Sequence, residues 1–250
     1  MCGRFAVEAS PEAIARHFLI AGLDEFPPRY NIAPTQPILA VTAGPRRERG
    51  SNLPGRSALL VRWGLIPAWI KNTSDLPLLF NARSETAAEK AAFRAAMRHR
   101  RALVPASGFY EWRRTGRNMS QAYWVRPKHG GIVAFGAILE TFAEPGGSEI
   151  DTGAILTTQA SPDLAGIHDR MPVVIQPRDF SRWLDCVNHE PRDVADLMRS
   201  PAARLFEAVP VSDRVNKVTN MGADLLRRTE PAERASRKGE PGSTGQLELF

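Results

Sequence analysis

The residue whose type and place most directly suggest covalent chemistry is Cys2, which follows Met1. If an aminopeptidase removes Met1, Cys2 carries a free α-amine beside its thiol, with reference pKa values of roughly 7.7–8.0 and 8.5. Such a 1,2-aminothiol condenses with an aldehyde to a Schiff base, and the thiol then closes a thiazolidine ring. In a second route the thiol attacks a carbonyl while the amine serves as its base. Position alone also fits an incidental cysteine in a frayed terminus.

The segments that must position this terminus are short strands and a few helices. Ser10 and Pro11 predict the start of a helix over residues 10–20. Alanines with Phe93 and Met97 at helical spacing predict a longer helix over 86–101. Two short helices are expected at 180–186 and 194–198. Short β-branched or aromatic runs between turn residues predict strands at 38–42, 58–63, 103–105, 109–113, 122–126, 132–139, 153–158, 172–175 and 206–211.

This order of elements predicts the fold class and the domain organisation. We expect an α+β fold, a single domain with a curled, mostly antiparallel β-sheet that is barrel-like at its core and flanked by short helices. The domain is expected to span residues 1–227. Residues 228–250 form an expected disordered tail, because they are charged and rich in Gly, Pro and Ser as far as position 245.

The composition bounds the function without deciding it. The net charge is +6 from 33 basic and 27 acidic residues, and 28 of the basic residues are arginine. This charge suits a nucleic-acid partner, but an arginine-rich genome and a partly solvated basic surface explain it equally well. No apolar run approaches the roughly 18 residues of a membrane helix, and the N-terminus, without an apolar segment behind a basic patch, is not expected to be a signal peptide. Since Cys2 and Cys186 cannot form a disulfide framework, a reducing, cytoplasmic location is expected.

Six phrases along the chain carry a family resemblance. They are, in order, MCGRF at 1–5, RYNIAPTQ at 29–36, RWGLIPAW at 62–69, FNARSET at 80–86, ALVPASGFYEW at 102–112 and IHDRMPVVI at 167–175. Together they resemble the SOS-response-associated peptidase (SRAP) family, whose members crosslink to abasic sites in single-stranded DNA. The resemblance covers roughly residues 1–220 and implies the SRAP fold. It implies no cofactor and no metal, and a nucleoid-associated place in the cytoplasm.

In this family the mature N-terminal cysteine captures the ring-opened sugar aldehyde of an abasic site, and Cys2 matches that position. The thiazolidine product shields the lesion from strand cleavage and error-prone bypass. "Peptidase" refers to the proposed autocatalytic removal of Met1, and general proteolysis does not follow. Asn81 in FNARSE matches the active-site asparagine, whose amide can hold both the aminothiol and a sugar hydroxyl. Without the motif, a turn or cap asparagine is the simpler interpretation.

Two further residues are implied to move protons. Glu111 in GFYEW matches the catalytic glutamate, and neighbouring aromatic residues are expected to raise its pKa so that it protonates the ring oxygen of the closed sugar. His168 in IHDRMP matches the histidine that exchanges protons during Schiff-base formation and its reversal. The simpler interpretations are a strand glutamate paired with Arg113 and a structural histidine.

The resemblance also implies a path for DNA. Arg4, Arg83 and Arg170 match basic residues that hold phosphates around the lesion, which gives affinity without sequence preference. Trp63 and Trp69 lie in a segment expected to support bases or to wedge into a duplex end, because aromatic faces suit unstacked bases. Core packing is the equal alternative for Trp63.

The last residues resemble a second known motif. Gln246, Leu247, Leu249 and Phe250, in the sequence QLELF, are similar to the bacterial peptide that binds the sliding clamp. On a tether, such a peptide would raise the effective concentration at stalled forks. A C-terminal strand that folds back onto the domain is the alternative.

Two other functions remain open from the residues. An N-terminal-nucleophile amidotransferase also exposes Cys2 and often begins Met-Cys-Gly, but it usually has a synthase domain, and it leaves GFYEW and IHDRMP unexplained. A non-catalytic DNA-binding adaptor recruited by the clamp would need Leu249 and Phe250 but not Cys2.

Overall fold

The computed structural model describes residues 2–45, 55–74, 76–117, 119–144 and 146–230. Its strands are β1 (Phe5–Val7), β2 (Arg29–Ile32), β3 (Pro37–Ala43), β4 (Arg56–Trp63), β5 (Asn81–Arg83), β6 (Arg101–Ala106), β7 (Gly108–Arg114), β8 (Ser120–Pro127), β9 (Val133–Ala143), β10 (Glu149–Gln159), β11 (Arg170–Pro172), β12 (Val174–Ile175) and β13 (Phe206–Pro210). Its α-helices are α1 (Pro11–Phe18), α2 (Arg94–His99) and α3 (Phe180–Leu184). Its 3-10 helices are η1 (Pro177–Asp179), η2 (Pro191–Met198), η3 (Asp213–Asn216) and η4 (Ala223–Leu226).

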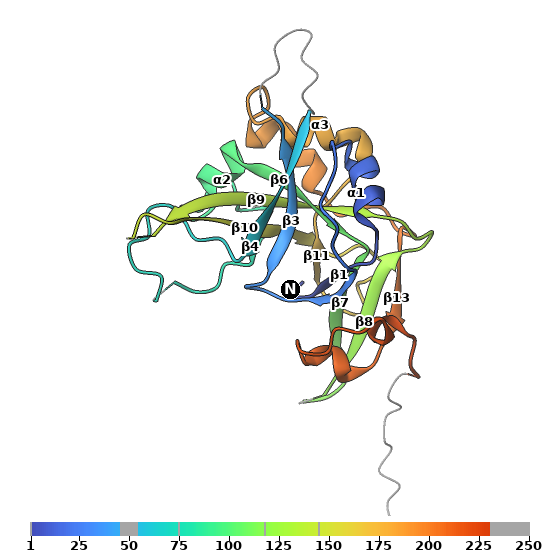
Figure 1. The fold of residues 1–250 in the computed structure, drawn as a ribbon. Helices are drawn as coiled ribbons and strands as arrows, with labels where there is room; N and C mark the ends of the chain where they lie inside the picture. The colour runs from blue at the N-terminus through green and yellow to red at the C-terminus, as the bar shows by residue number, and fades with distance from the viewer. Residues whose placement is uncertain (1, 46–54, 75, 118, 145, 231–250) are drawn as a thin grey trace, which may run out of the picture.

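The larger sheet closes on itself. Strands β10, β4, β3, β6 and β9 are hydrogen-bonded in that order, and β9 pairs back with β10. Figure 1 shows β3 and β4 crossing the long strands β9 and β10 steeply. The join between β10 and β4 is a short parallel one, Thr152 to Arg62 and Gly153 to Trp63. A Cβ at Gly153 would lie 2.8 Å from Leu139 Cδ2 on β9 and 3.4 Å from Val61 Cγ2 on β4, so the glycine lets both neighbouring strands pack closely. The ring confirms the expected barrel-like, mostly antiparallel core of an α+β fold.

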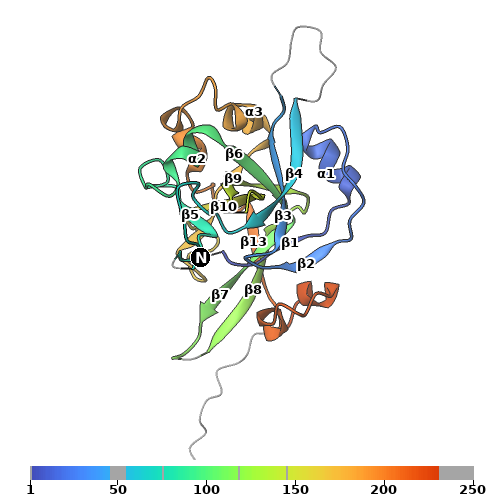
Figure 2. The same ribbon diagram turned by 60° about the vertical axis from the view of Figure 1, so that its left-hand side comes forward.

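A second sheet packs against this barrel through aromatic side chains. Its strand order is β13, β8, β7, β1 and β2, with antiparallel pairing throughout. The ring of Phe5 in β1 lies 5.2 Å from that of Trp63 and 5.9 Å from that of Phe135, both edge-on. Figure 2 shows the β7–β8 hairpin extending away from the barrel. The N-terminal strand is therefore held in the centre of the molecule.

The first predicted helix is confirmed, with slightly narrower bounds. Ser10 caps α1, since its Oγ accepts from the backbone N–H of Ala13 at 3.3 Å. Ile14 and Phe18 are fully buried on its inner face. The helix ends at Leu19, whose φ of 54° is left-handed.

The long helix predicted over 86–101 is wrong in its first half. Only Arg94–His99 is helical, and the residues from Ser84 to Phe93 form turns. The backbone N–H of Ser84 donates to Thr157 on β10, so sheet pairing continues past β5. At the other end Arg101 enters β6, where its guanidinium is buried. Helical spacing of the alanines did not reveal these two sheet contacts.

The predicted strands are present with bounds shifted by a few residues, except that the strand predicted at 172–175 divides between β11 and β12, which pair with β10 and β9. The helices at 180–186 and 194–198 correspond to α3 and η2. The short strands β1, β2 and β5 were not predicted, because three or four residues give too little alternation. The domain boundary at 227 remains a prediction; described contacts reach Thr229, whose N–H donates to Pro210. No helix in the described ranges is long and apolar enough to cross a membrane.

Candidate active site

The site forms where β1 runs beside β7. Phe5 pairs with Phe109, and the backbone N–H of Tyr110 donates to the carbonyl of Arg4 at 2.9 Å. This antiparallel register places Glu111 beside the backbone just before β1, where Cys2 lies. Cys2 is fully buried, so the terminus is packed rather than frayed at this residue. Its Sγ contacts the carbonyl of Arg4 at 3.7 Å.

Asn81 reaches the same point from the barrel. It opens β5, which pairs in parallel with β10 through Asn81 and Ile155. Its Nδ2 donates to the carbonyl oxygen of Cys2 at 2.8 Å. Its Oδ1 is buried and has no hydrogen-bond partner among the described residues. The amide therefore fixes the backbone of Cys2 through Nδ2, and its Oδ1 remains available to accept a hydrogen bond.

His168 approaches Glu111 from the turn between β10 and β11. Its Nε2 lies 3.9 Å from Glu111 Oε2. Its Nδ1 lies 2.9 Å from the backbone nitrogen of Arg170 and 3.0 Å from Asp169 Oδ1. A backbone N–H can only donate, and Asp169 is 86% exposed, so Nδ1 is best assigned as the acceptor. In the neutral ring the proton then sits on Nε2, the nitrogen that faces Glu111.

Burial sets the protonation states of these groups. It raises the pKa of Glu111 to about 7 and lowers the pKa of His168 below its usual value. Burial also raises the pKa of the Cys2 thiol, and the negative charge of Glu111 raises it further. Near neutral pH the thiol and the imidazole are thus uncharged, while Glu111 exchanges its proton readily. A carboxyl and an imidazole with such pKa values suit general acid–base chemistry.

Basic side chains border this centre. Arg170 Nη1 and Nη2 donate to the two carboxylate oxygens of Glu85 at 2.6 and 2.8 Å. Arg83, on the strand that carries Asn81, is exposed. Arg83 lies on β5 with Asn81, and Arg170 opens β11 two residues after His168; their contact with phosphates stays a prediction.

Arg4 is bound by the protein itself, and its predicted contact with phosphate stays a prediction. Its guanidinium donates to Asn31 Oδ1 at 2.8 Å and to the carbonyls of Val215 and Asn216 at 2.6 and 3.0 Å. These bonds tie β1 to β2 and η3. Its guanidinium is engaged by protein acceptors in this structure, so Arg4 holds the N-terminal strand in place.

Comparison with known proteins decides the family. The family described as "SOS response associated peptidase (SRAP)" matches residues 1–218. The chain belongs to the SRAP family. It is 33% identical to the abasic site processing protein YoqW of Bacillus subtilis. The 229 aligned residues cover 90% of this chain and 99% of YoqW. It is 32% identical to YedK of Escherichia coli over 90% of this chain and 99% of that protein. It is 28% identical to HMCES of mouse, over 85% of this chain and 70% of that protein.

Solved structures show the same SRAP fold. A protein from Bacteroides thetaiotaomicron superposes with a TM-score of 0.78 at 21% identity, over 92% of this chain and all of that one. A protein from Bordetella bronchiseptica superposes with a TM-score of 0.70 at 21% identity, over 85% of this chain and all of that one. At this identity the match concerns the fold alone.

The two tryptophans of this SRAP chain divide between core and surface. Trp63 is fully buried, and its indole N–H donates to the carbonyl of Phe80 at 2.8 Å. The prediction that it contacts bases is therefore wrong for this structure, and core packing is its role. Trp69 is 62% exposed on the segment between β4 and β5.

The sequence reasoning missed a hollow next to His168. It has a volume of about 540 Å³ and is lined by 112–114 and 165–169. Arg114 lies in this lining, and its positive charge makes a small contribution to the lowered pKa of His168, which is due mainly to burial. The sequence feature that could have indicated this hollow is the pair Arg113 and Arg114, which directly follows GFYEW. The hollow therefore places His168 beside two arginines, Arg113 and Arg114.

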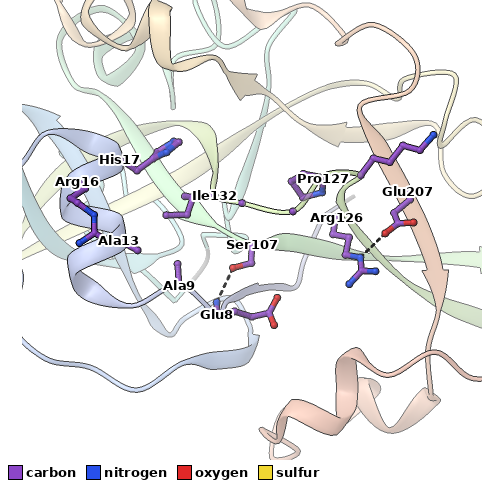
Figure 3. Close-up of a pocket in the computed structure, with 13 residues that line it drawn as sticks. Glu8, Ala9, Ala13, Arg16, His17, Ser107, Arg126, Pro127, Ile132 and Glu207 are labelled. Atoms are coloured by element: carbon purple, nitrogen blue, oxygen red, sulfur yellow. Dashed lines mark hydrogen bonds and ion pairs between the residues drawn. The ribbon is translucent and has the colours of Figure 1, made fainter.

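A second hollow of about 870 Å³ contains none of the predicted residues. Figure 3 shows it between α1 and the ends of β8 and β13, where Arg126 pairs with Glu207 at 2.8 Å. Within the described ranges, no group of three or more His, Cys, Asp or Glu side chains could hold a metal ion. The predicted clamp peptide, Gln246, Leu247, Leu249 and Phe250, lies outside the described residues.

Proposed function

We propose that this protein recognises abasic sites in single-stranded DNA and captures them covalently through Cys2 after Met1 is removed. The carrying observation is the placement of Cys2, held by Asn81 beside a carboxyl group whose pKa burial raises to about 7. The names of the curated relatives, abasic site processing proteins, support this substrate.

The raised pKa of the Cys2 thiol selects between the two routes open to an aminothiol. A thiol that stays protonated is a weak nucleophile, whereas part of an α-amine with a pKa of roughly 7.7–8.0 is unprotonated at neutral pH. The amine therefore attacks the aldehyde first. The aldehyde oxygen leaves as water and a Schiff base forms. The sulfur then adds to the same carbon, its proton passes to the nitrogen, and the thiazolidine ring closes.

Glu111 and His168 supply the proton transfers. The closed deoxyribose opens when a proton reaches the ring oxygen, and a carboxyl with a pKa of about 7 delivers one at neutral pH. His168 faces Glu111 through Nε2 and exchanges protons with it and with the leaving water. The same groups run in reverse would release the adduct.

Three arginines and one aromatic side chain hold the DNA strand in this proposal. Arg83, Arg114 and Arg170 bind backbone phosphates on either side of the lesion. Trp69 offers an exposed face on which a base stacks. Such contacts read no sequence, which suits a lesion that occurs anywhere in chromosomal DNA.

We include self-removal of Met1 in the proposal. Hydrolysis of the Met1–Cys2 peptide bond consumes one water and releases free methionine. Protein made by translation without an aminopeptidase tests this step. We expect intact-mass measurement to show loss of Met1 from the wild type. Retention of Met1 in the wild type would assign its removal to another enzyme.

Intact-mass spectrometry of the adduct tests the main proposal. The expected mass is that of the Met1-free protein plus abasic DNA minus one water. Absence of this species in wild-type protein would contradict the proposal. Incubation with glutamine tests the amidotransferase alternative: ammonia release that Cys2→Ala abolishes would favour that enzyme instead.

The clamp peptide at Gln246–Phe250 is a separate proposal that rests on its sequence. Replacement of Leu249 and Phe250 by alanine is expected to abolish binding to purified bacterial sliding clamp and to leave adduct formation unchanged. Unchanged clamp binding by this variant would show that the C-terminal peptide does not bind the clamp.

A further inference from the structure

The guanidinium of Arg170 is occupied by a carboxylate of the protein itself. Its bidentate pair with Glu85, at 2.6 and 2.8 Å, has the geometry of the strongest Arg–carboxylate pairs. A separate bond runs from Nη2 to the carbonyl of Thr157 at 2.6 Å. The side chain of Arg170 is 15% exposed, against 50% for Glu85. The arginine is thus anchored on β10, while the carboxylate lies at the surface.

Glu85 also lies within reach of a second cation. Its hydrogen bonds to Arg170 lower its pKa most, and the charges of Arg170 and Arg83 lower it further. The carboxylate is therefore ionised at neutral pH. A backbone phosphate presents to a guanidinium the same bidentate pair of anionic oxygens. Glu85 occupies the place where a phosphate between Arg83 and Arg170 would sit.

We propose that Glu85 is an internal phosphate mimic, which screens Arg170 in the free protein and is displaced by a backbone phosphate of single-stranded DNA. The inference rests on the proposed function, since that function supplies the phosphate. The bond to the Thr157 carbonyl does not involve Glu85, so Arg170 stays in position during the exchange. Half exposed, Glu85 rotates into solvent without crossing the core.

This exchange has a signature in the salt dependence of binding. When a phosphate replaces Glu85, Arg170 exchanges one anion for another, and the released carboxylate attracts cations from solution. Binding therefore releases fewer counterions in total than it would if the carboxylate were absent. Without the carboxylate, the slope of log K against log salt concentration becomes steeper by up to about 0.7, the value for one single-strand phosphate.

Glu85→Gln tests the proposal, with Glu89→Gln as the matched control. Glu89 is exposed and lies four residues further along, so its replacement removes the same charge. The probe is a fluorescent, undamaged oligothymidylate, with anisotropy measured over a range of salt concentrations. We expect Glu85→Gln to bind about three- to fivefold more tightly than wild type at low salt, with the steeper slope. Adding Arg170→Ala should cancel the gain.

Two results would overturn the inference. Equal affinities and slopes for Glu85→Gln and Glu89→Gln would show that net charge alone acts. Weaker binding by Glu85→Gln would show that the carboxylate is needed to orient Arg170. Adduct formation on abasic DNA, measured in parallel, separates the two claims: a wild type without adduct, beside a Glu85→Gln variant with the steeper slope, removes the proposed function and leaves this inference standing.

Discussion

Asn81 Nδ2 donates to the carbonyl oxygen of Cys2 at 2.8 Å, and Oδ1 of the same amide is buried without a hydrogen-bond partner in the described part of the chain. An unsatisfied buried acceptor costs free energy, so its place beside the proposed nucleophile calls for a reason. A donor that arrives with the reaction, the α-amine of Cys2 or a sugar hydroxyl, would satisfy it. In the proposed function, Asn81 fixes the backbone in the free protein and would bind the substrate during capture.

Asn81→Asp tests this double role without changing the side-chain shape. The variant loses the donor and turns a carboxylate oxygen toward the Cys2 carbonyl, which misplaces the aminothiol. We expect adduct formation about 10- to 100-fold slower than in the wild type, measured by gel time courses. Asn72→Asp, at an exposed turn, is the control and should react at the wild-type rate. An Asn81→Asp variant as fast as wild type would remove this role.

Glu111→Gln should separate ring opening from the later steps. The amide keeps the shape of the side chain but cannot deliver a proton to the sugar. We expect the variant to be slowed much more on the closed-ring sugar of abasic DNA than on a simple aldehyde, which needs no ring opening. Rates on both substrates are compared by mass spectrometry. Equal slowing on the two would show that Glu111 does not open the ring.

Glu111 should also make the stability of the protein depend on pH. The pKa of its carboxyl is about 7 when folded, against 4.5 without burial, so the folded state binds more protons between these values. Its stabilising effect is complete below about pH 4.5 and is lost as the pH rises through about 7. Glu111→Gln lacks this loss, which is about 3 kcal/mol at most. Urea unfolding of both proteins at about pH 5 and about pH 8 checks it; parallel pH dependences would contradict the assignment.

Arg101 is predicted to matter for stability rather than for chemistry. It is 1% exposed, and its guanidinium donates to the carbonyls of Met97, Trp183, Asp185 and His189. Arg101→Met keeps most of the side-chain volume but leaves these carbonyls without their donor. We expect a loss of about 3–5 kcal/mol in the free energy of unfolding. The exposed Arg178→Met is the control, and a loss below about 1 kcal/mol for Arg101→Met would refute the prediction.

The sequence predicted most of the barrel because its strands are β-branched runs between clear turn signals, as in the segment that became β9. It failed where distant contacts override local preference. The alanine-rich start of the 86–101 segment is drawn into turns by the hydrogen bond from Ser84 to β10. Three-residue strands such as β5 carry too little pattern to be seen, although β5 positions Asn81.

The candidate site shows the same division. Motifs selected Cys2, Asn81, Glu111 and His168, which the structure brings together from four separate segments; their chemical roles remain proposals. Burial could not be derived from those motifs. Trp63 is buried in the core, and Arg4 donates hydrogen bonds to η3 that hold the N-terminal strand; neither contact is visible in the motifs. The pairing of Arg170 with Glu85 likewise depends on side-chain geometry.

The most direct test of the account is a denaturing gel of the protein with single-stranded DNA that carries one abasic site. The wild type and Cys186→Ala, which keeps the N-terminal cysteine, should each give a heat-stable band of lower mobility, and Cys2→Ala should give none. A wild-type protein without such a band, or a Cys2→Ala variant that retains it, would contradict covalent capture by Cys2.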